Sequence, residues 1–412
     1  MVADPNDAAV DSAAVRGATG PDFPKEGLAL SASPSSPLRI LYVNHVGLMS
    51  GAEKSLLRLL EGLDRTAVEP FVACPDGPLQ DAAVAIDIQC LGIEVLRPRR
   101  QSGPLKLLAL AWQGMRMGAE LREFIRRQRI DLVHANSLVA ALLCTSRKLG
   151  VPVVWHARDL RAPAAVVKQV LARVAGVIAI SRAVQEWVQS LRPGIPVQLI
   201  YNALGPDDYH VTRPRAKVRE DWEMASDTPL LGNVGQLVPW KRQDLFLRVG
   251  AEVIRQVPEA RLVIVGSDLF AEHPDYVLSL HHLADELGVA DHVLWVGACA
   301  DVPSCLAALD VLVHTADREP LGRVIMESMA VGLPTIAFND AGPAELIEDG
   351  VNGLLVPEAD LEAMAEAAKG VVTNLDRAVH LRDHAFARAA QFDARQQAAQ
   401  VLAVYRSLLK PA

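Results

Sequence analysis

Residues 311–338 have the sequence VLVHTADREPLGRVIMESMAVGLPTIAF, and this stretch decides the fold class. It begins with a largely apolar run at 311–315 and continues through a loop that contains proline and glycine. A helical pattern at 322–331 follows, and then a second apolar run at 334–338. Short apolar, β-branched runs predict buried strands, and the longer segment between them predicts a helix. Strand, helix and strand in this order are typical of a parallel sheet.

The same alternation runs along most of the chain in two series. In the first series we expect strands at 39–46, 69–74, 131–135, 152–156, 176–180 and 197–201, with helices at 52–63, 105–128, 137–149, 164–173 and 182–190. A polar stretch at 203–228 predicts a linker. In the second series we expect strands near 230–235, 261–266, 292–297, 311–315 and 334–338, with helices near 241–256, 276–287, 322–331, 343–348 and 360–373. Two more helices are expected near 377–390 and 393–409.

The two series predict two doubly wound α/β domains in tandem, over residues 37–204 and 205–392. A disordered tail over 1–36 precedes them, because that segment mixes Ala, Ser, Pro, Gly and Asp without apolar periodicity. A final helix over 393–412 is expected to pack back on the first domain. Ligands of open α/β sheets bind beyond the carboxyl ends of the strands, so two facing domains would hold the site in a cleft between them.

The composition argues against several classes of protein. The chain has 412 residues, with 41 Lys and Arg against 49 Asp and Glu, and its net charge of −8 argues against a nucleic-acid partner. The sequence lacks four common motifs: a P-loop, a G-x-G-x-x-G after a strand, an Asp-x-Asp and a His-Glu-x-x-His. P-loop NTPases, ordinary dinucleotide dehydrogenases and dedicated metal sites therefore have no sequence support.

Cysteine usage and hydropathy indicate the cellular compartment of the protein. The five cysteines contain no C-x-x-C pair, which favours reduced, buried thiols over a metal site or a dithiol. No apolar run approaches the roughly 18 residues needed to span a bilayer. The first residues carry Asp4 and Asp7 where a secretory signal would carry positive charge. These features predict a soluble, cytoplasmic protein.

Residues 317–330 form the strongest candidate site. Gly322 lets the backbone approach a ligand at the start of the predicted helix, where free N–H groups and the helix dipole favour a phosphate. Glu319 lies before this helix and Glu327 about one and a half turns inside it. The two carboxylates could therefore contact different parts of one elongated ligand, although glutamate is most often a solvated surface acid.

A second candidate is the stretch GNVGQLVPWKR at 232–242. It predicts a strand, a tight loop and then Lys241 and Arg242 at the start of a helix. Cations oppose the helix dipole at that end, so an anionic ligand would explain them better than helix stability does. A solvated Lys-Arg pair is the common alternative.

These two stretches resemble the retaining family-4 glycosyltransferases of GT-B fold, whose hallmark is a Glu-x7-Glu element in the C-terminal domain. The similarity extends over most of 38–405 and includes the segments 47–53, 134–137, 154–159, 180–182, 200–202, 341–345 and 352–356. The resemblance implies a transferase that moves a sugar from a nucleotide diphosphate-sugar to a hydroxyl acceptor with retention and without a metal or other cofactor. A front-face displacement is expected, in which the leaving phosphate takes the acceptor proton.

The resemblance also implies roles for individual residues. Glu327 would hold the ribose hydroxyls, Glu319 would contact the transferred sugar, and Lys241 would neutralise the diphosphate with help from Arg242. His156 would face the sugar and the acceptor. The remaining donor-binding positions, largely backbone contacts, are Gly51, Gly235, Gly322, Arg323 and Val324.

One position departs from the family pattern and leaves rival functions open. Many relatives carry arginine where this chain has Gln236, and Arg242 or Arg323 would have to compensate. The expected role is cell-envelope polysaccharide or glycolipid synthesis, and the alternative is transfer to a soluble small molecule or natural product. A nucleotide-sugar 2-epimerase and a non-catalytic nucleotide-sugar-binding protein are less favoured alternatives.

Other features have structural alternatives of equal or greater weight. His134 is expected to be a hydrogen-bonded core residue, Glu53 could simply favour its helix, and Arg158 and Arg182 could be ordinary surface charges. Glu345 could contact a sugar, but an acid at the start of a helix explains it equally well. The basic stretch at 105–128 could contact anionic membrane at the inner face, but an ordinary covering helix is slightly favoured.

Overall fold

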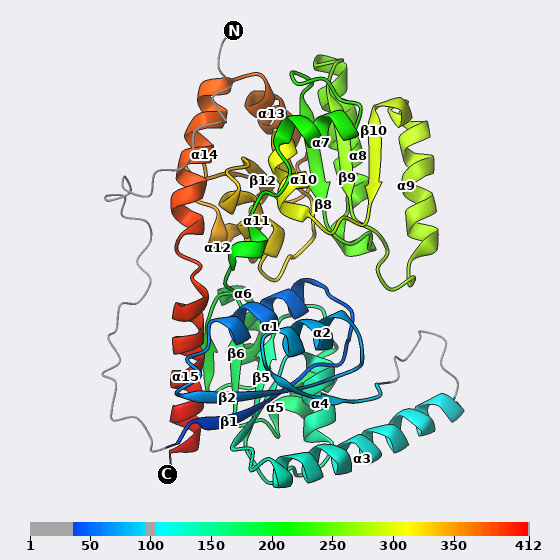
Figure 1. The fold of residues 1–412 in the computed structure, drawn as a ribbon. Helices are drawn as coiled ribbons and strands as arrows, with labels where there is room; N and C mark the ends of the chain where they lie inside the picture. Colours follow the sequence, from blue (N-terminus) through cyan, green and yellow to red (C-terminus); the bar gives the residue numbers. More distant parts are fainter. Residues whose placement is uncertain (1–35, 96–103, 411–412) are drawn as a thin grey trace. The chain divides into compact units, whose positions relative to one another are not determined.

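The computed structural model of the chain describes residues 36–95 and 104–410, and in the helix that begins at Pro104 it describes side chains from residue 116 onward. These residues form two parallel β-sheets with helices packed against them (Figure 1). The predicted α/β class, with two doubly wound domains, is confirmed. The predicted disordered tail, residues 1–36, lies outside the described residues except for Ser36.

In the described part of the chain, the first sheet has seven strands in the order β3-β2-β1-β4-β5-β6-β7. They are β1 (Leu38–Val43), β2 (Val68–Cys74), β3 (Gln89–Gly92), β4 (Leu132–Ala135), β5 (Val153–Ala157), β6 (Gly176–Ala179) and β7 (Val197–Leu199). Their helices are α1 (Gly51–Glu61), α2 (Pro78–Ala85), α3 (Pro104–Arg127), α4 (Leu138–Thr145), α5 (Ala164–Leu171) and α6 (Arg182–Leu191). The strand order switches between β1 and β4, the position where such sheets bind ligands.

The second sheet has six described strands in the order β10-β9-β8-β11-β12-β13. They are β8 (Leu230–Val234), β9 (Arg261–Val265), β10 (Val293–Gly297), β11 (Val311–His314), β12 (Thr335–Phe338) and β13 (Leu354–Val356). The main helices are α8 (Gln243–Gln256), α9 (Pro274–Glu286), α10 (Val302–Ala308), α11 (Arg323–Ala330), α12 (Pro343–Leu346), α13 (Leu361–Val372), α14 (Leu375–Ala389) and α15 (Ala394–Leu409). In this sheet the strand order switches between β8 and β11.

Several elements differ from the sequence-based expectation. The edge strands β3 and β13 and the helix α2 were not predicted, because they are short and lack a long apolar run. The stretch 203–228 is not a plain linker: it contains the 3-10 turn η1 (Pro206–Asp208) and the helix α7 (Arg215–Asp221). Helix α7 is specified by tertiary contacts, since buried Arg219 donates to the carbonyl of Ala308 at 2.9 Å and pairs with Asp310 at 2.8 Å.

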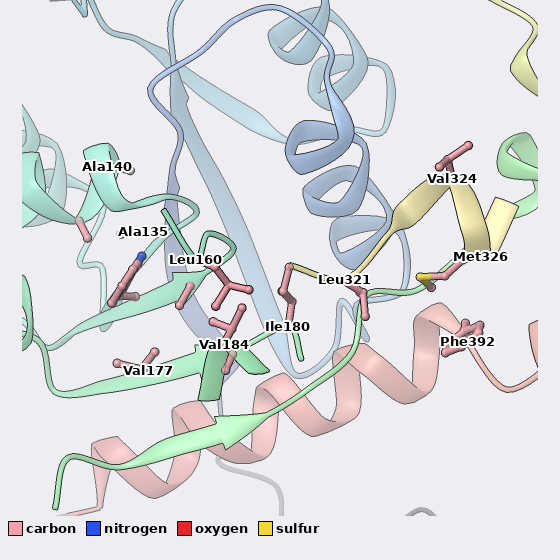
Figure 2. Packing of buried hydrophobic residues seen from close by; sticks show 14 of the residues in the cluster. Ala135, Ala140, Leu160, Val177, Ile180, Val184, Leu321, Val324, Met326 and Phe392 are labelled. Atoms are coloured by element: carbon pink, nitrogen blue, oxygen red, sulfur yellow. The ribbon is translucent and has the colours of Figure 1, made fainter. Parts of the chain in front are cut away.

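One cluster of buried apolar residues has members from both halves of the chain. Figure 2 shows side chains from the first sheet and its helices beside side chains from the second half; those labelled are Ala135, Ala140, Leu160, Val177, Ile180, Val184, Leu321, Val324, Met326 and Phe392. Leu321 and Val324 lie on either side of Gly322, the glycine that precedes α11. The loop that carries Glu319 is therefore packed on its apolar side.

The last helix, α15, packs on the first half of the chain. Ala398, Val401 and Tyr405 are buried in a cluster that also contains residues of β1 and α1. Near the start of the helix, Gln397 Nε2 donates to the carbonyl of Tyr201 at 2.9 Å. Among the helices that the structure describes, none is both long and apolar enough to cross a bilayer.

Candidate active site

The loop between β11 and α11 is anchored to two neighbouring loops. Gly322 precedes α11 with φ of 98°, and a Cβ there would lie 2.9 Å from a side-chain carbon in the first turn. Both facts favour glycine. The amide of Gly342 donates to the carbonyl of Glu319 at 2.9 Å, and the amide of Asp317 donates to the carbonyl of Trp240 at 2.9 Å. Glu319 is therefore held between the loops that follow β8 and β12.

Two of the predicted catalytic side chains, Lys241 and Glu319, contact each other. Lys241 Nζ lies 2.5 Å from Glu319 Oε2, and His314 Nε2 lies 3.4 Å from the same oxygen. Burial would raise the pKa of Glu319, which is 7% exposed, but the charge of Lys241 and the nearby His314 outweigh burial and lower that pKa to about 2. Glu319 is therefore a carboxylate at neutral pH, with Lys241 as its counter-ion.

The backbone around Lys241 is a tight turn. A 3-10 turn, η2 (Pro239–Lys241), leads into Arg242, whose φ is 53°, and α8 begins only at Gln243. The hydroxyl of Thr315 donates to the carbonyl of Arg242 at 2.9 Å. A Cβ on Gly235 would lie 3.9 Å from Lys241 Cε, so these two predicted positions are neighbours.

Arg242 already has a local partner. Its Nε and Nη2 atoms each lie 3.0 Å from an oxygen of Asp244. The sequence favours an anionic ligand as the explanation of cations at this helix start, but Asp244 supplies negative charge within the same helix. That argument therefore does not apply to Arg242, and Lys241 is the cation aimed at Glu319.

Glu327 lies at one end of a buried row of charged side chains. Arg323 Nε donates to Glu327 Oε1 at 2.8 Å, and Arg323 Nη2 lies 2.5 Å from Asp208 Oδ1. Arg58 Nε in turn donates to Asp208 Oδ2 at 2.8 Å. Burial would raise the pKa of Asp208, but the charges of Arg323 and Arg58 outweigh burial and lower it. Sequence reasoning missed Asp208 and Arg58, because only the fold brings together residues so far apart in the chain.

The loop before α1 lies against Arg323. A Cβ built on Gly51 would lie 3.8 Å from Arg323 Cδ. Glu53 accepts a hydrogen bond from the amide of Ser50 at 3.2 Å and from Asn44 Nδ2 at 2.9 Å. Ser50 and Glu53 thus form a capping box, so Glu53 has the helix-starting role that the sequence left open.

His156 is fully buried in β5, inside a polar network. Its Nδ1 lies 3.1 Å from His134 Nε2 and 3.1 Å from Arg158 Nη2. Arg158 also donates from Nε to Asn136 Oδ1 at 3.1 Å and from Nη1 to Asn202 Oδ1 at 2.8 Å. Burial first, then the charge of Arg158 and the neighbouring His134, hold the pKa of His156 well below its usual value. His156 is therefore neutral.

Arg158 is not an ordinary surface charge, the alternative that the sequence offered. It lies in the buried network at the carboxyl edge of the first sheet, and burial lowers its pKa to about 9 despite the opposing charge of Glu53. The positive charge of Arg323 lowers the pKa further.

The predicted site residues therefore fall into three groups. Gly235, Lys241, Glu319 and Gly322 form the first, and Gly51, Arg323, Val324 and Glu327 form the second. His156 belongs to the separate network around Arg158. Arg242 lies beside Lys241 in the chain but turns to Asp244.

Glu345 has a structural role that neither sequence interpretation foresaw. Its carboxylate accepts from the amides of Arg182 and Ala183 at 2.7 and 2.9 Å, and from the hydroxyl of Tyr201 at 2.8 Å. It thus caps the amino terminus of α6, a helix of the first half, and not its own helix. The Arg182 side chain itself is exposed, as expected of a surface charge.

Three carboxylates gather beside this site. Oxygens of Asp317, Asp340 and Glu358 lie within 4.8 Å of one another, each on a residue that follows one of the strands β11, β12 and β13. Sequence spacing could not have found them. Arg161 pairs with Asp317 at 3.3 Å, and exposed acids often cluster without an ion, so we assign no metal to them.

The cysteines contain a pair that the sequence argued against. Cys299 Sγ lies 2.8 Å from Cys305 Sγ, although the residues are six positions apart without a C-x-x-C spacing. The hydrogen bond from Cys305 lowers the pKa of Cys299 to about 7 against the effect of burial, while the pKa of Cys305 is raised. Both residues are free thiols, as expected, although Cys299 is only partly buried.

The described part of α3 behaves as a covering helix. Met117, Leu121 and Ile125 are buried in the core of the first half. Exposed Arg126 and Arg127 both pair with Glu123, at 2.8 and 2.7 Å. The leucines and Trp112 between the basic residues of 105–115, which the alternative of membrane contact involves, lie outside the described side chains.

Two family profiles match successive parts of the chain. The profile for glycosyltransferase family 4 matches residues 49–208, and the profile for glycosyl transferases group 1 matches residues 214–388. The chain belongs to the family-4 glycosyltransferases. Its fold is accordingly GT-B, and the profiles divide where the first sheet gives way to the second.

Solved and curated members of this group show the likeness in more detail. HepE from Anabaena, solved in complex with UDP and glucose and also with UDP-glucose, is 26% identical, with a TM-score of 0.76 over 90% of this chain and 100% of that chain. The lipopolysaccharide core biosynthesis glycosyltransferase LpsE of Rhizobium meliloti is 33% identical over 38% of this chain and 43% of LpsE. A GDP-mannose-dependent α-(1-6)-phosphatidylinositol monomannoside mannosyltransferase of Mycolicibacterium smegmatis is 32% identical over 40% of this chain and 44% of that enzyme. The chain thus spans less than half the length of these two curated relatives.

Proposed function

We propose that the chain transfers a sugar from a nucleoside diphosphate-sugar to a hydroxyl group, with retention of the anomeric configuration. The observation that carries this proposal is the buried Lys241–Glu319 pair in the loops that follow β8 and β11. These strands flank the switch point of the second sheet, where an open α/β sheet binds its ligand. The likeness to HepE, whose crystals hold UDP-glucose, supports a nucleotide-sugar donor.

The reaction requires a cation beside the leaving diphosphate. As the bond between the anomeric carbon and the diphosphate oxygen breaks, negative charge grows on that oxygen, and the acceptor oxygen bonds to the same face of the carbon. The acceptor proton passes to the leaving diphosphate. Lys241 is assigned to stabilise this charge, as a fixed ammonium in a largely buried position. Its three N–H donors allow it to keep Glu319 and also bind a phosphate oxygen.

The carboxylates are assigned to different parts of the donor. Glu319, whose pKa is held at about 2, accepts hydrogen bonds from sugar hydroxyls and does not donate a proton at neutral pH. Glu327 accepts from the ribose hydroxyls, and Arg323 keeps its carboxylate oriented. Backbone N–H groups at Gly322, Arg323 and Val324 add to the phosphate contacts, so the proposed reaction needs no metal.

For the acceptor we propose a cell-envelope polysaccharide or glycolipid, glycosylated by a cytoplasmic protein. The relatives LpsE and the phosphatidylinositol mannoside mannosyltransferase favour this class. The alternative is a soluble small molecule. The ion pairs of Arg126 and Arg127 with Glu123 reduce the attraction of α3 for anionic lipid, and this favours the alternative.

The test is incubation of the purified protein with UDP- and GDP-sugars, first without an acceptor. Slow release of the nucleoside diphosphate supports a transferase, a changed sugar at C2 supports an epimerase, and binding without turnover supports a non-catalytic protein. Lys241→Ala and Glu319→Gln should both slow release strongly, whereas Arg242→Ala should not. Once an acceptor is found, proton NMR of the product distinguishes retention from inversion.

A further inference from the structure

Two cysteines of the second half of the chain are in contact with each other. Cys299 lies in the loop that follows β10, and Cys305 lies in α10. Their Sγ atoms are 2.8 Å apart, and both residues are free thiols. The proposed transfer of a sugar uses neither of them. The pair is therefore a cluster of nucleophilic side chains without an assigned task.

The turn between the two cysteines is held by polar contacts. Asp301 Oδ1 accepts from the amide of Ser304 at 3.2 Å, and this contact caps the first turn of α10. Asp301 Oδ2 accepts from the hydroxyl of Thr212 at 2.6 Å. The hydroxyl oxygen of Ser304 accepts from the amides of Thr212 and Arg213 at 3.1 and 3.0 Å. These contacts fix the backbone between the two sulfur atoms, so the pair is preorganised.

The two thiols differ in their access to solvent. Cys305 is 1% exposed and belongs to the apolar cluster that both halves of the chain share. Cys299 is only partly buried, and it lies between the exposed residues Ala298 and Ala300. A small reagent in solution can therefore reach Cys299 but not Cys305.

The surroundings also favour the thiolate at the accessible position. The hydrogen bond from Cys305 lowers the pKa of Cys299 to about 7 against the effect of burial, and the positive charge of Arg213 lowers it as well. The hydrogen bond to Cys299 and burial raise the pKa of Cys305. At neutral pH a large part of Cys299 is therefore thiolate, the nucleophilic form, while Cys305 keeps its proton.

We propose that Cys299 and Cys305 form a thiol–disulfide exchange site that reacts with low-molecular-weight disulfides such as glutathione disulfide. The Cys299 thiolate attacks one sulfur of that molecule and bonds to it, and one glutathione leaves as a thiolate. Cys305 then attacks the Cys299 sulfur, and the second glutathione leaves with the proton that Cys305 gives up. The two cysteines lose two electrons and two protons, and glutathione disulfide becomes two thiols.

The contact between the sulfur atoms favours the second step over any competing reaction. A disulfide bond is about 2.05 Å long, so the two sulfur atoms need to approach by only roughly 0.8 Å. Since Cys305 is already beside the mixed disulfide, its attack is intramolecular and outcompetes free thiols. In a reducing environment the pair stays a dithiol, and a rise in oxidised low-molecular-weight disulfides closes it.

The experiment is incubation of the full chain with glutathione disulfide at pH 7, followed by acid quenching, digestion and mass spectrometry without reductant. We expect a disulfide between Cys299 and Cys305, release of two glutathiones per chain, and reversal by dithiothreitol. Cys305→Ser should stop after the first step, with one glutathione retained on Cys299. Cys299→Ser should leave Cys305 reduced, because Cys305 is buried.

Cys90 is the matched control thiol. It is also only partly buried, but its Sγ lies 3.6 Å from the carbonyl oxygen of Ile88, and burial raises its pKa. Cys299 should react at least about fivefold faster than Cys90, because its larger thiolate fraction outweighs its lower intrinsic nucleophilicity. Cys90→Ser should leave the disulfide between Cys299 and Cys305 unchanged.

Three results would overturn the assignment. Glutathione that stays on Cys299 of the native chain removes Cys305 as the attacking thiol of the second step. Equal rates for Cys299 and Cys90 remove the activation of Cys299. A native chain that gains neither glutathione nor a disulfide removes the site. The result on the native chain stands even if Cys305→Ser fails to fold, and since the exchange needs no sugar donor, it is independent of the proposed function.

Discussion

Replacing Glu319 with glutamine removes one charge from a buried pair while it keeps the size of the side chain. Folding lowers the pKa of Glu319 from 4.5 to about 2, and each unit is worth about 1.4 kcal/mol, so the carboxylate contributes about 3 kcal/mol of stability at neutral pH. A lowered pKa stabilises the folded state above pH 4.5, and this contribution is lost as the pH falls toward 2. The loss in Glu319→Gln should therefore be about 3 kcal/mol at pH 7 and between about 1 and 2 kcal/mol near pH 3.

Urea unfolding followed by circular dichroism at several pH values measures this difference. Lys241→Met and the double variant Lys241→Met/Glu319→Gln complete a double-mutant cycle. The double variant should lose little more stability than either single variant. Glu366→Gln is the matched control, because Glu366 also pairs with a lysine, Lys369 at 2.6 Å, but on the exposed face of α13. It should change stability little.

The same variant separates stability from catalysis. Glu319→Gln should keep its affinity for the nucleoside diphosphate, since Glu319 is assigned to the sugar, and should lower transfer about 10²-fold. A loss of stability below about 0.5 kcal/mol, typical of a surface pair, would refute the electrostatic reasoning. So would a loss that does not change between pH 7 and pH 3. Near-normal transfer would leave Glu319 a structural acid.

Four further outcomes are expected. Glu327→Ala should weaken nucleotide binding by about 1.5–3 kcal/mol by calorimetry, because a charge-assisted acceptor is lost; unchanged affinity would remove it from the site. Lys241→Ala should lower kcat more than it raises KM, whereas Arg242→Ala, already paired within its helix, should change kcat little; the reverse order would exchange their roles. Iodoacetamide at pH 7 should modify Cys299 before the other cysteines, because its pKa is about 7, and Cys305→Ser should slow that reaction; equal rates by mass spectrometry would contradict the pairing. Transfer should persist in EDTA, and its loss with recovery on added Mg²⁺ would contradict a metal-free reaction.

The sequence predicted the second half's central βαβ unit closely, because there the local pattern and the tertiary environment agree. Strands β11 and β12 and helix α11 lie within two residues of the expected bounds. Helix α7 was missed because what holds it is Arg219 in contact with Asp310, and no periodicity shows that contact. Strand β13 was missed because its apolar run is confined to three residues between Gly353 and Pro357.

The sequence predicted which residues belong to the candidate site, but it did not predict which of them contact one another. Lys241 and Glu319 were each selected for an expected ligand, and the structure adds that each is the other's counter-ion. Arg158 resembled a surface cation, since a sequence does not show that two asparagines and a histidine will enclose it. Asp208 lies in a stretch interpreted as linker, although it joins Arg58 to Arg323.

The position of α15 has a consequence for how the protein is made. Tyr405 and Val401 complete a core whose other members lie largely in β1, β2 and α1, so the earliest-synthesised part of the chain depends on its last helix. At about 5–20 residues per second, the ribosome needs roughly 10–40 s to add the 200 or so residues between the end of the first sheet and Tyr405. During that interval the apolar surface around Tyr42 and Leu56 stays uncovered. Nascent chains of this length should therefore depend on holding chaperones until α15 has been synthesised, and a chain that stops before residue 394 should be degraded.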